Sequence, residues 1–147
     1  GASQPHRHLQ LLPRAAGEPI CARQSWFESR AAGTTTLVDD PLLRSCRVVP
    51  LTSALKGEML YRMYLTLAAD LGLGDPSNDH RPRGAYNLLL SRRWMAMVRR
   101  RTEGIRGFSV NALGFAGSLL STEASDREWI HRSGPEALLH AVVEANC

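Results

Sequence analysis

Two histidines and a glutamine stand at alternate positions near the start of the 147-residue chain, at His6, His8 and Gln10. In a β-strand every second side chain lies on the same face, so an extended chain would align these three groups. A helix would instead separate His6 from His8 by about 200° around its axis. The spacing has chemical meaning only in a strand, and we predict a strand over 5–12 that ends at Pro13.

A neutral imidazole is a competent nucleophile towards phosphorus, because one ring nitrogen attacks while the other donates a hydrogen bond that fixes the tautomer. His8 has a polar neighbour on each side, so we predict it as the nucleophile, assisted by His6 and Gln10. The Gln10 amide can donate to a phosphoryl oxygen without adding a titrating group. Leu9 and Leu11 point to the other face and are expected to enter the core.

The residues before the histidines add donors of the same kind. Ser3 and Gln4 could each give a hydrogen bond to a phosphate oxygen. A His-x-His pair taken alone is more often an ordinary surface pair than a catalytic one, because many histidines are surface or core residues without a role in catalysis. The rest of the chain has to decide between these two interpretations.

Arginine carries nearly all of the positive charge, because Lys56 is the only lysine among 18 basic residues. Arginine binds phosphate oxygens bidentately, so the net charge of +4 suits a polyphosphate ligand and equally suits nucleic acid. The arginine clusters at 92–93 and 99–101 are interpreted as solvated loop charge, with polyphosphate contact as the alternative. Charge alone therefore does not select a ligand.

The three cysteines, Cys21, Cys46 and Cys147, form no C-x-x-C pair and cannot all pair within one chain, which favours a reducing, cytoplasmic setting. No Cys/His cluster has the spacing of a zinc site, and we expect no covalently bound cofactor. No apolar run approaches the roughly 20 residues that span a bilayer, so we expect no membrane partner. The motif begins only a few residues after Gly1, and we expect that a natural N-terminal part precedes it.

The order of strands, helix, strands and helices further along the chain predicts an α+β fold. Strands are expected in three apolar runs: 46–51, 85–90 and 94–98, the last two joined by a hairpin turn. Helices are expected in three runs: 52–71, 126–131 and 135–145. In the first helix, Met59 and Met63 lie on the apolar stripe and are expected in the core. Residues 14–40 are expected to form a long connection with little regular structure. Between 108 and 122 a strand close to a ligand and a tightly packed helix are both possible.

The first ten residues, GASQPHRHLQ, resemble the active-site strand of the diadenosine tetraphosphate phosphorylases, which are also called ATP adenylyltransferases. These enzymes belong to the histidine-triad superfamily, in the branch that includes galactose-1-phosphate uridylyltransferase. Independent segments resemble the C-terminal domain of the same enzymes, in the family's order: YNLLL at 86–90, WM at 94–95 and SVNALGFAG at 109–117.

The resemblance implies an enzyme that uses inorganic phosphate to split diadenosine tetraphosphate into ATP and ADP. The middle histidine of the family's motif becomes adenylylated, and it corresponds to His8. Gln10 corresponds to the glutamine that contacts the phosphate, and glutamine at this place, rather than a third histidine, is typical of transferases. The nucleotide site is expected to include four downstream residues: Asn111, Ala112, Leu113 and Ser118.

The resemblance also implies a fold and a domain arrangement. We expect a partial histidine-triad-like antiparallel sheet with packed helices, in one continuous unit. Residues 1–50 would carry the active-site strand and the excursion after it, and residues 51–147 would form the region like the C-terminal domain. Strands upstream of the motif complete the nucleotide pocket in the family, so we expect a second chain or an N-terminal half to complete the sheet, because a bare strand edge invites pairing.

Other functions stay open. Some relatives carry a lysine near Thr122 that contacts phosphate, and this chain has none there. Because the family's upstream strands do not precede the motif in this chain, a truncated, non-catalytic remnant that binds adenine nucleotides is an alternative. The arginine content also allows a small basic nucleic-acid-binding module, but the aromatic interleaving typical of such modules is missing, and we do not expect a nucleic acid partner. A divalent cation such as Mg²⁺ is expected to accompany the polyphosphate substrate.

Overall fold

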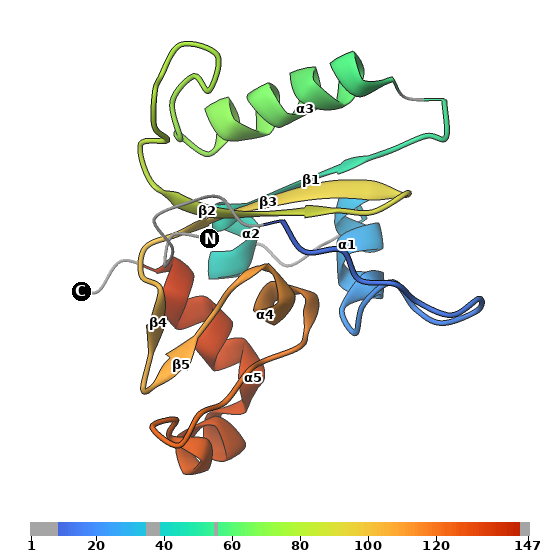
Figure 1. The fold of residues 1–147 in the computed structure, drawn as a ribbon. Helices are drawn as coiled ribbons and strands as arrows, with labels where there is room; N and C mark the ends of the chain where they lie inside the picture. The colour runs from blue at the N-terminus through green and yellow to red at the C-terminus, as the bar shows by residue number, and fades with distance from the viewer. Residues whose placement is uncertain (1–8, 35–38, 55, 145–147) are drawn as a thin grey trace.

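An antiparallel sheet of three strands forms the centre of the fold, with helices on both of its faces (Figure 1). The computed structural model describes residues 9–34, 39–54 and 56–144. The elements in chain order are α1 (Gln24–Ala31), α2 (Pro41–Ser45), β1 (Cys46–Pro50), α3 (Gly57–Asp70), β2 (Ala85–Leu90), β3 (Trp94–Arg100), β4 (Gly104–Ile105), β5 (Phe108–Ser109), α4 (Ala112–Ala116) and α5 (Arg127–Val143). The sheet has the order β1–β3–β2, and β4 pairs with β5 separately. This mixture confirms the predicted α+β class.

The hairpin between β2 and β3 forms where the sequence predicts it. Ser91 N donates to Trp94 O at 3.0 Å, and the Ser91 hydroxyl accepts from Arg93 N at 3.1 Å and from Trp94 N at 3.0 Å. A serine in a turn can satisfy exposed backbone amides in this way. The strand predicted over 94–98 continues to Arg100, and the strand predicted over 46–51 ends at Pro50.

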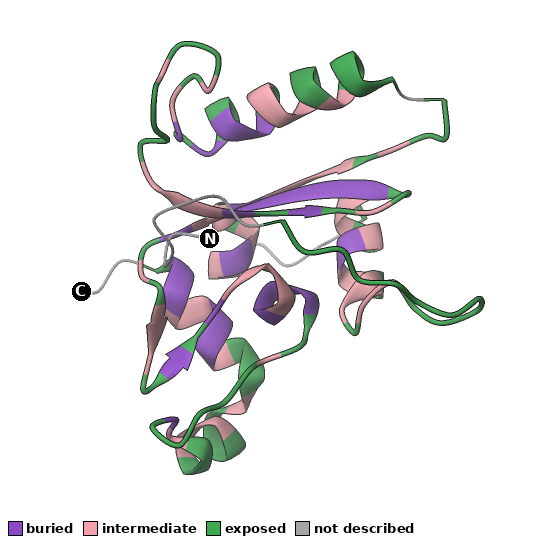
Figure 2. Ribbon diagram, viewed as in Figure 1, coloured by how far each residue is buried: buried purple, intermediate pink, exposed green. Residues whose placement is uncertain are grey.

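Alternate residues of β3 face two hydrophobic cores, because successive side chains of a strand point to opposite faces. Trp94, Ala96 and Val98 face the main core, which is completed by helical residues: Phe27, Leu42, Phe115, Leu138 and Val142. Met95 and Met97 face a smaller core under α3, which includes Leu67, Leu71 and Leu73. Cover on both faces leaves β3 buried along nearly its whole length (Figure 2).

The helix predicted over 52–71 is confirmed as α3, although it begins later, at Gly57. The buried part of α3 lies towards the end of the helix (Figure 2), where Leu67 and Ala68 are buried, and Met63 is partly buried against the smaller core. Met59 is 47% exposed, so the expectation that it fills the core is wrong. The reason is that the first turns of α3 extend past the part of the helix that meets the core.

The end of α3 has the geometry that its sequence predicts. Gly72 has a φ of 63°, its N–H donates to Ala69 O at 2.9 Å, and Leu73 N donates to Ala68 O at 2.9 Å. This pair of bonds satisfies the last carbonyls of a helix, and glycine adopts the left-handed conformation without a steric penalty.

The two helices predicted near the C-terminus are confirmed as two parts of α5. Asp126 accepts from Trp129 N at 2.8 Å and caps the first part. Gly134, with a φ of 79° and a ψ of 160°, interrupts the helix, and Pro135 begins the second part, where its missing N–H costs no hydrogen bond. Within the described ranges, no helix is long and apolar enough to cross a bilayer.

Two expectations for less regular parts of the chain need correction. The connection predicted over 14–40 contains the helix α1, whose only buried residue is Phe27. A single buried residue gives no apolar period from which a helix could be predicted. The 108–122 segment contains both the short strand β5 and the short helix α4, so a strand and a helix each occupy a part of it.

The strand predicted over 5–12 is wrong for its described part. Residues 5–8 lie outside the described residues, and residues 9–12 form no strand. Leu9 and Leu11 are 88% and 85% exposed instead of entering the core. The physical reason is that no strand in the described part of the chain pairs with this segment, so its backbone polar groups are left to water.

Candidate functional site

The histidine motif lies largely outside the described residues, which exclude Ser3, Gln4, His6 and His8. Gln10 is described and lies exposed in the segment before Pro13. The roles assigned to these five residues therefore stay predictions.

The structure brings the four downstream site residues together in one short segment, 111–118. Asn111 precedes α4, and its side-chain oxygen accepts from Gly114 N at 3.1 Å, which caps the helix. Ala112 and Leu113 form the first turn of α4 and are half-buried. Ser118 is exposed, and its N–H donates to Leu113 O at 2.9 Å. One helical turn thus places the predicted nucleotide contacts side by side.

Gly117 ends α4 in a conformation that requires glycine. Its φ is 104°, in the left-handed region that other residues rarely adopt. A Cβ at this position would lie 2.8 Å from the Cβ of Ala22 and 3.2 Å from the Cγ of Arg23. The absence of a side chain therefore lets the chain around Ala22 pack directly on the end of the 111–118 segment.

Arg23 joins three parts of the chain at this contact. Its backbone N–H donates to Ala116 O at 3.2 Å, and its Nη1 donates to Phe115 O at 3.3 Å. Its Nη2 forms an ion pair with Glu136 at 3.1 Å, and the guanidinium lies 4.7 Å from the centre of the Trp26 ring. A charged donor is suited to the carbonyls at a helix C-terminus, which otherwise lack partners. We call this group of contacts the Arg23 joint.

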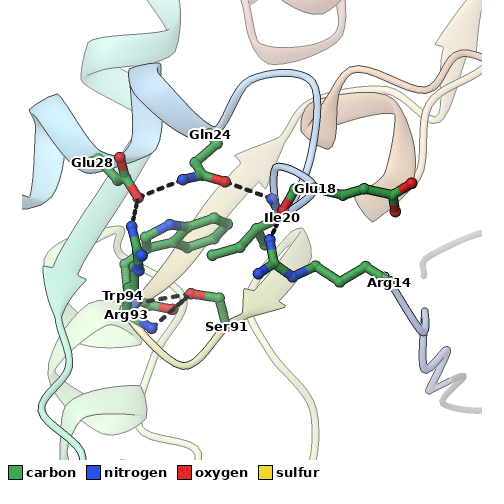
Figure 3. Close-up of polar contacts among 8 residues, drawn as sticks. All are labelled: Arg14, Glu18, Ile20, Gln24, Glu28, Ser91, Arg93 and Trp94. Atoms are coloured by element: carbon green, nitrogen blue, oxygen red, sulfur yellow. Dashed lines mark hydrogen bonds and ion pairs between the residues drawn. The ribbon is translucent and has the colours of Figure 1, made fainter. Parts of the chain in front are cut away.

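A second set of polar contacts holds α1 against the β2–β3 hairpin (Figure 3). Ile20 N donates to the Gln24 side chain, whose Nε2 donates to Glu28 Oε1 at 2.8 Å. Arg93, from the hairpin turn, donates to the same Glu28 oxygen at 2.9 Å. Gln24 and Glu28 were not expected to have a role, although their i, i+4 spacing is typical of a helix.

Aromatic stacking reinforces the same attachment beneath these polar contacts. The ring of Phe27, on α1, stacks on the ring of Trp94, the first residue of β3, with 4.4 Å between ring centres and 15° between planes. Residues 20–31, which follow the histidine motif in the chain, are thereby fixed against the sheet on one side and the 111–118 segment on the other.

Arg100 is buried beside Val110, the residue that directly precedes the 111–118 segment. It is 3% exposed, and its Nη1 donates to Val110 O and, at 3.4 Å, to Glu103 O. Burial lowers the pKa of the Arg100 guanidinium, while the nearby Glu103 carboxylate acts in the opposite direction. Asn87, on the neighbouring strand, is 5% exposed, and its side-chain oxygen has no hydrogen-bond partner in the described part of the chain.

A family model described as the ATP adenylyltransferase C-terminal domain matches residues 42–144. The chain belongs to this family. The matched range runs from α2 to the end of α5 and includes the whole 111–118 segment, whereas the histidine motif precedes it. No curated protein and no solved structure gives a match.

Two arginines of this ATP adenylyltransferase family member have structural partners that the sequence did not indicate. Arg99 Nη1 donates to Leu71 O at 2.9 Å, and Arg100 is buried. The interpretation of the 99–101 cluster as solvated loop charge is therefore wrong for these two residues. Arg93 pairs with Glu28 from its exposed position in the hairpin turn.

The cysteines do not form a reactive site in the described residues. Cys46 is fully buried, and burial raises its pKa to about 12; burial also raises the pKa of the half-buried Cys21. A thiol with a raised pKa is a poor nucleophile at neutral pH, because the thiolate is the reactive form. Among the residues that the structure describes, no three His, Cys, Asp or Glu side chains are placed to hold a metal ion.

Two shallow hollows occur on the described surface. One, of about 400 Å³, is lined by four residues of α5: Arg127, Glu128, His131 and Arg132. The other is lined by residues 103–109 of the β4–β5 hairpin. Neither hollow includes Asn111, Ala112 or Leu113 in its lining.

Proposed function

We propose that the chain is part of a nucleotidyltransferase that uses phosphate to split diadenosine tetraphosphate into ATP and ADP through an adenylylated His8. The family match over 42–144 is the observation that carries this proposal. It is supported by the resemblance of the first ten residues to the active-site strand of the same enzymes. The Arg23 joint adds a physical connection, because it fixes the chain that follows the motif to the 111–118 segment.

The reaction consists of two displacements at one phosphorus atom. In the first, a ring nitrogen of His8 forms a bond to the α-phosphorus of one adenosine, and the bond from that phosphorus to the bridging oxygen breaks, so that ATP leaves. In the second, an oxygen of inorganic phosphate attacks the same phosphorus, the nitrogen–phosphorus bond breaks, and ADP leaves. Two inversions retain the configuration at phosphorus, and the kinetics are ping-pong.

The residues around His8 have distinct roles in this proposal. Gln10 donates to a phosphoryl oxygen on which negative charge develops, and His6, two positions before His8, would assist the nucleophile. Ser3 and Gln4 supply further donors to phosphate. None of these four side chains needs to change its charge during the two displacements.

Asn111 is the polar side chain of the 111–118 segment whose geometry limits its role. Its side-chain oxygen accepts from Gly114 N, so its amide nitrogen is the group that can donate to the nucleotide. Ala112 and Leu113 supply apolar contact beside it, and Ser118 supplies a hydroxyl at the other end of the segment. The segment would bind the adenosine through one donor, one hydroxyl and an apolar surface.

A divalent cation such as Mg²⁺ would accompany the substrate and not reside in the protein. Polyphosphate oxygens are good Mg²⁺ ligands and usually supply part of its coordination. Among the described residues, no three His, Cys, Asp or Glu side chains lie close enough together to hold a metal ion.

Isolation of the covalent intermediate tests the proposal. The chain is incubated with diadenosine tetraphosphate that carries a radiolabel at the α-phosphorus, without phosphate, and the protein is digested at neutral pH. We expect acid-labile label on the peptide that contains His8, in no more than one equivalent per chain, and release of the label as ADP when phosphate is added. The His8→Ala chain should stay unlabelled, whereas His131→Ala, a change at an exposed position of α5, should label normally. Equal labelling of the His8→Ala chain would reject His8 as the nucleophile.

A further inference from the structure

Arg100 is a buried cation whose hydrogen bonds go to the backbone. It is the last residue of β3, its side chain lies on the side of the main core, and it is 3% exposed. Nη1 donates to Val110 O and to Glu103 O, while Nε and Nη2 have no hydrogen-bond partner in the described part of the chain. Removing a guanidinium from water is costly, and an apolar side chain of similar volume would fill this space without that cost. An apolar residue, however, could not donate a hydrogen bond to these two carbonyls.

These two carbonyls stand at the two ends of the β4–β5 hairpin. Glu103 precedes β4, Val110 follows β5, and Val110 N donates to Glu103 O at 2.9 Å. The Arg100 side chain therefore links the two ends of the β4–β5 hairpin. The backbone next to it is also anchored, because Arg101 N donates to Val142 O, on α5, at 2.8 Å. The guanidinium is thus attached to a fixed point of the fold.

The position of Val110 determines the position of the 111–118 segment. Val110 is fully buried and directly precedes Asn111. A Cβ on Gly114 would lie 2.9 Å from Val110 Cγ1, so α4 already packs on Val110 as closely as a glycine permits. Movement of the Val110 backbone would consequently move the first turn of α4 and the Asn111 side chain.

We propose that Arg100 is a positioning residue for nucleotide binding: its bonds to Val110 O and Glu103 O hold the start of the 111–118 segment where the adenosine binds. Arg100 itself touches no substrate and acts through Val110 and Asn111. The part of this inference that concerns the nucleotide rests on the proposed function; the part that concerns the position of the segment does not.

Hydrogen exchange tests the position of the segment without any nucleotide. In Arg100→Met we expect the amides of Val110 and Gly114 to exchange on the order of tenfold faster or more, because the hydrogen bonds that the charged guanidinium donates to Val110 O and Glu103 O are lost. The matched control is Arg99→Met, the adjacent residue of β3, which donates to Leu71 O instead and should leave both amides unchanged. If Arg100→Met does not fold, Arg100→Lys carries the same comparison, with a smaller increase because one charged donor remains. Unchanged exchange in the folded Arg100 variant would overturn the inference.

Nucleotide binding supplies the readout that a purely stabilising residue would not move. Measured well below the melting temperature, KM or the nucleotide Kd should rise about tenfold in Arg100→Met, and kcat should change less. Arg100→Lys should recover part of the affinity. In a double-mutant cycle, Arg100→Met and Asn111→Ala together should weaken binding less than the product of their separate effects, because both act on one contact.

The two proposals fail in different ways. The proposed function is rejected if the wild-type chain binds no adenine nucleotide. If the amides of Val110 and Gly114 nevertheless exchange faster in Arg100→Met, the structural role of Arg100 is still supported. If the wild-type chain binds nucleotide and Arg100→Met binds it with the same affinity, the role of Arg100 in binding is rejected. The proposed function is then still supported.

Discussion

Gly117 and Ala22, both exposed, are in direct contact, with only 2.8 Å between the Ala22 Cβ and the position that a Cβ of Gly117 would take. The contact joins the chain that follows the histidine motif to the end of the segment that carries the predicted nucleotide contacts. Arg23 reinforces it with bonds to Phe115 O and Ala116 O. The chain around residues 22–23 and the end of the 111–118 segment are therefore joined at one closely packed point.

Gly117→Ala should destabilise the fold by more than backbone strain alone. The left-handed conformation costs a residue with a Cβ about 1–2 kcal/mol, and the clash with Ala22 should add roughly 1–3 kcal/mol. The matched control is Gly33→Ala, which has a φ of 68° and nothing within 4 Å of a new Cβ, and should show the strain alone. Chemical denaturation measures both variants, and equal losses would show that the contact with Ala22 contributes nothing.

Arg23→Met should lower the free energy of unfolding by about 2 kcal/mol, because the bond to Phe115 O at a largely buried site is lost. Glu136→Gln should change it by less than about 0.5 kcal/mol, because the Glu136 carboxylate is 54% exposed and exposed ion pairs contribute little. A loss for Glu136→Gln as large as that for Arg23→Met would assign the stabilisation to the ion pair instead of to the bond with the helix end.

Substitutions of Asn111 should separate stability from nucleotide affinity. Asn111→Asp retains an oxygen that can accept from Gly114 N, so its stability should stay within about 0.5 kcal/mol of wild type, whereas Asn111→Ala should lose about 1 kcal/mol. Both changes remove the amide donor and should weaken nucleotide binding on the order of tenfold. Calorimetric titration with ATP checks the affinity. An Asn111→Asp chain that binds as wild type would exclude the amide nitrogen as a nucleotide contact.

The buried thiol of Cys46 should make the fold sensitive to alkaline pH. Burial raises its pKa from 9.0 to about 12, so the folded chain keeps the proton while the unfolded chain loses it. The contribution is complete below pH 9 and is lost as pH rises towards 12, with a slope of up to about 1.4 kcal/mol per pH unit. Denaturation curves of wild type and Cys46→Ala between pH 8 and 11 measure the difference in slope. Parallel curves would show that the thiol ionises equally in both states.

Local patterns were sufficient to predict much of the fold. The hairpin at 91–93 and the end of α3 at Gly72 each depend on residues close in sequence, and the structure confirms them. The apolar stripe of α3 is confirmed only in the second half of the helix, because Met59 is exposed. The strand expected over 5–12 failed in its described part, because a strand needs a partner and the described chain supplies none. Helix α1 was missed because Phe27 is its only buried residue.

The candidate site could be predicted only in part. Asn111, Leu113 and Ser118 were predicted as nucleotide contacts from the resemblance to the diadenosine tetraphosphate phosphorylases, and they lie close together in and around α4. Arg23 and Arg100 could not be found in this way, because their partners depend on how the chain folds: Arg23 and Phe115 are 92 positions apart. Arg100 looked like one member of an exposed basic cluster, and nothing in its immediate sequence shows that it is buried under Val110.

The dependence of product formation on phosphate tests the central claim most directly. The chain is incubated with unlabelled diadenosine tetraphosphate and with inorganic phosphate that carries ¹⁸O. The nucleotide products are then separated, and their masses are measured by mass spectrometry. Transfer through His8 predicts equal amounts of ATP and ADP, with ¹⁸O only in the terminal phosphate of ADP and no product without phosphate beyond one equivalent of ATP. Release of AMP, formation of ADP without ¹⁸O, or no cleavage by the wild-type chain would contradict phosphorolysis by this protein.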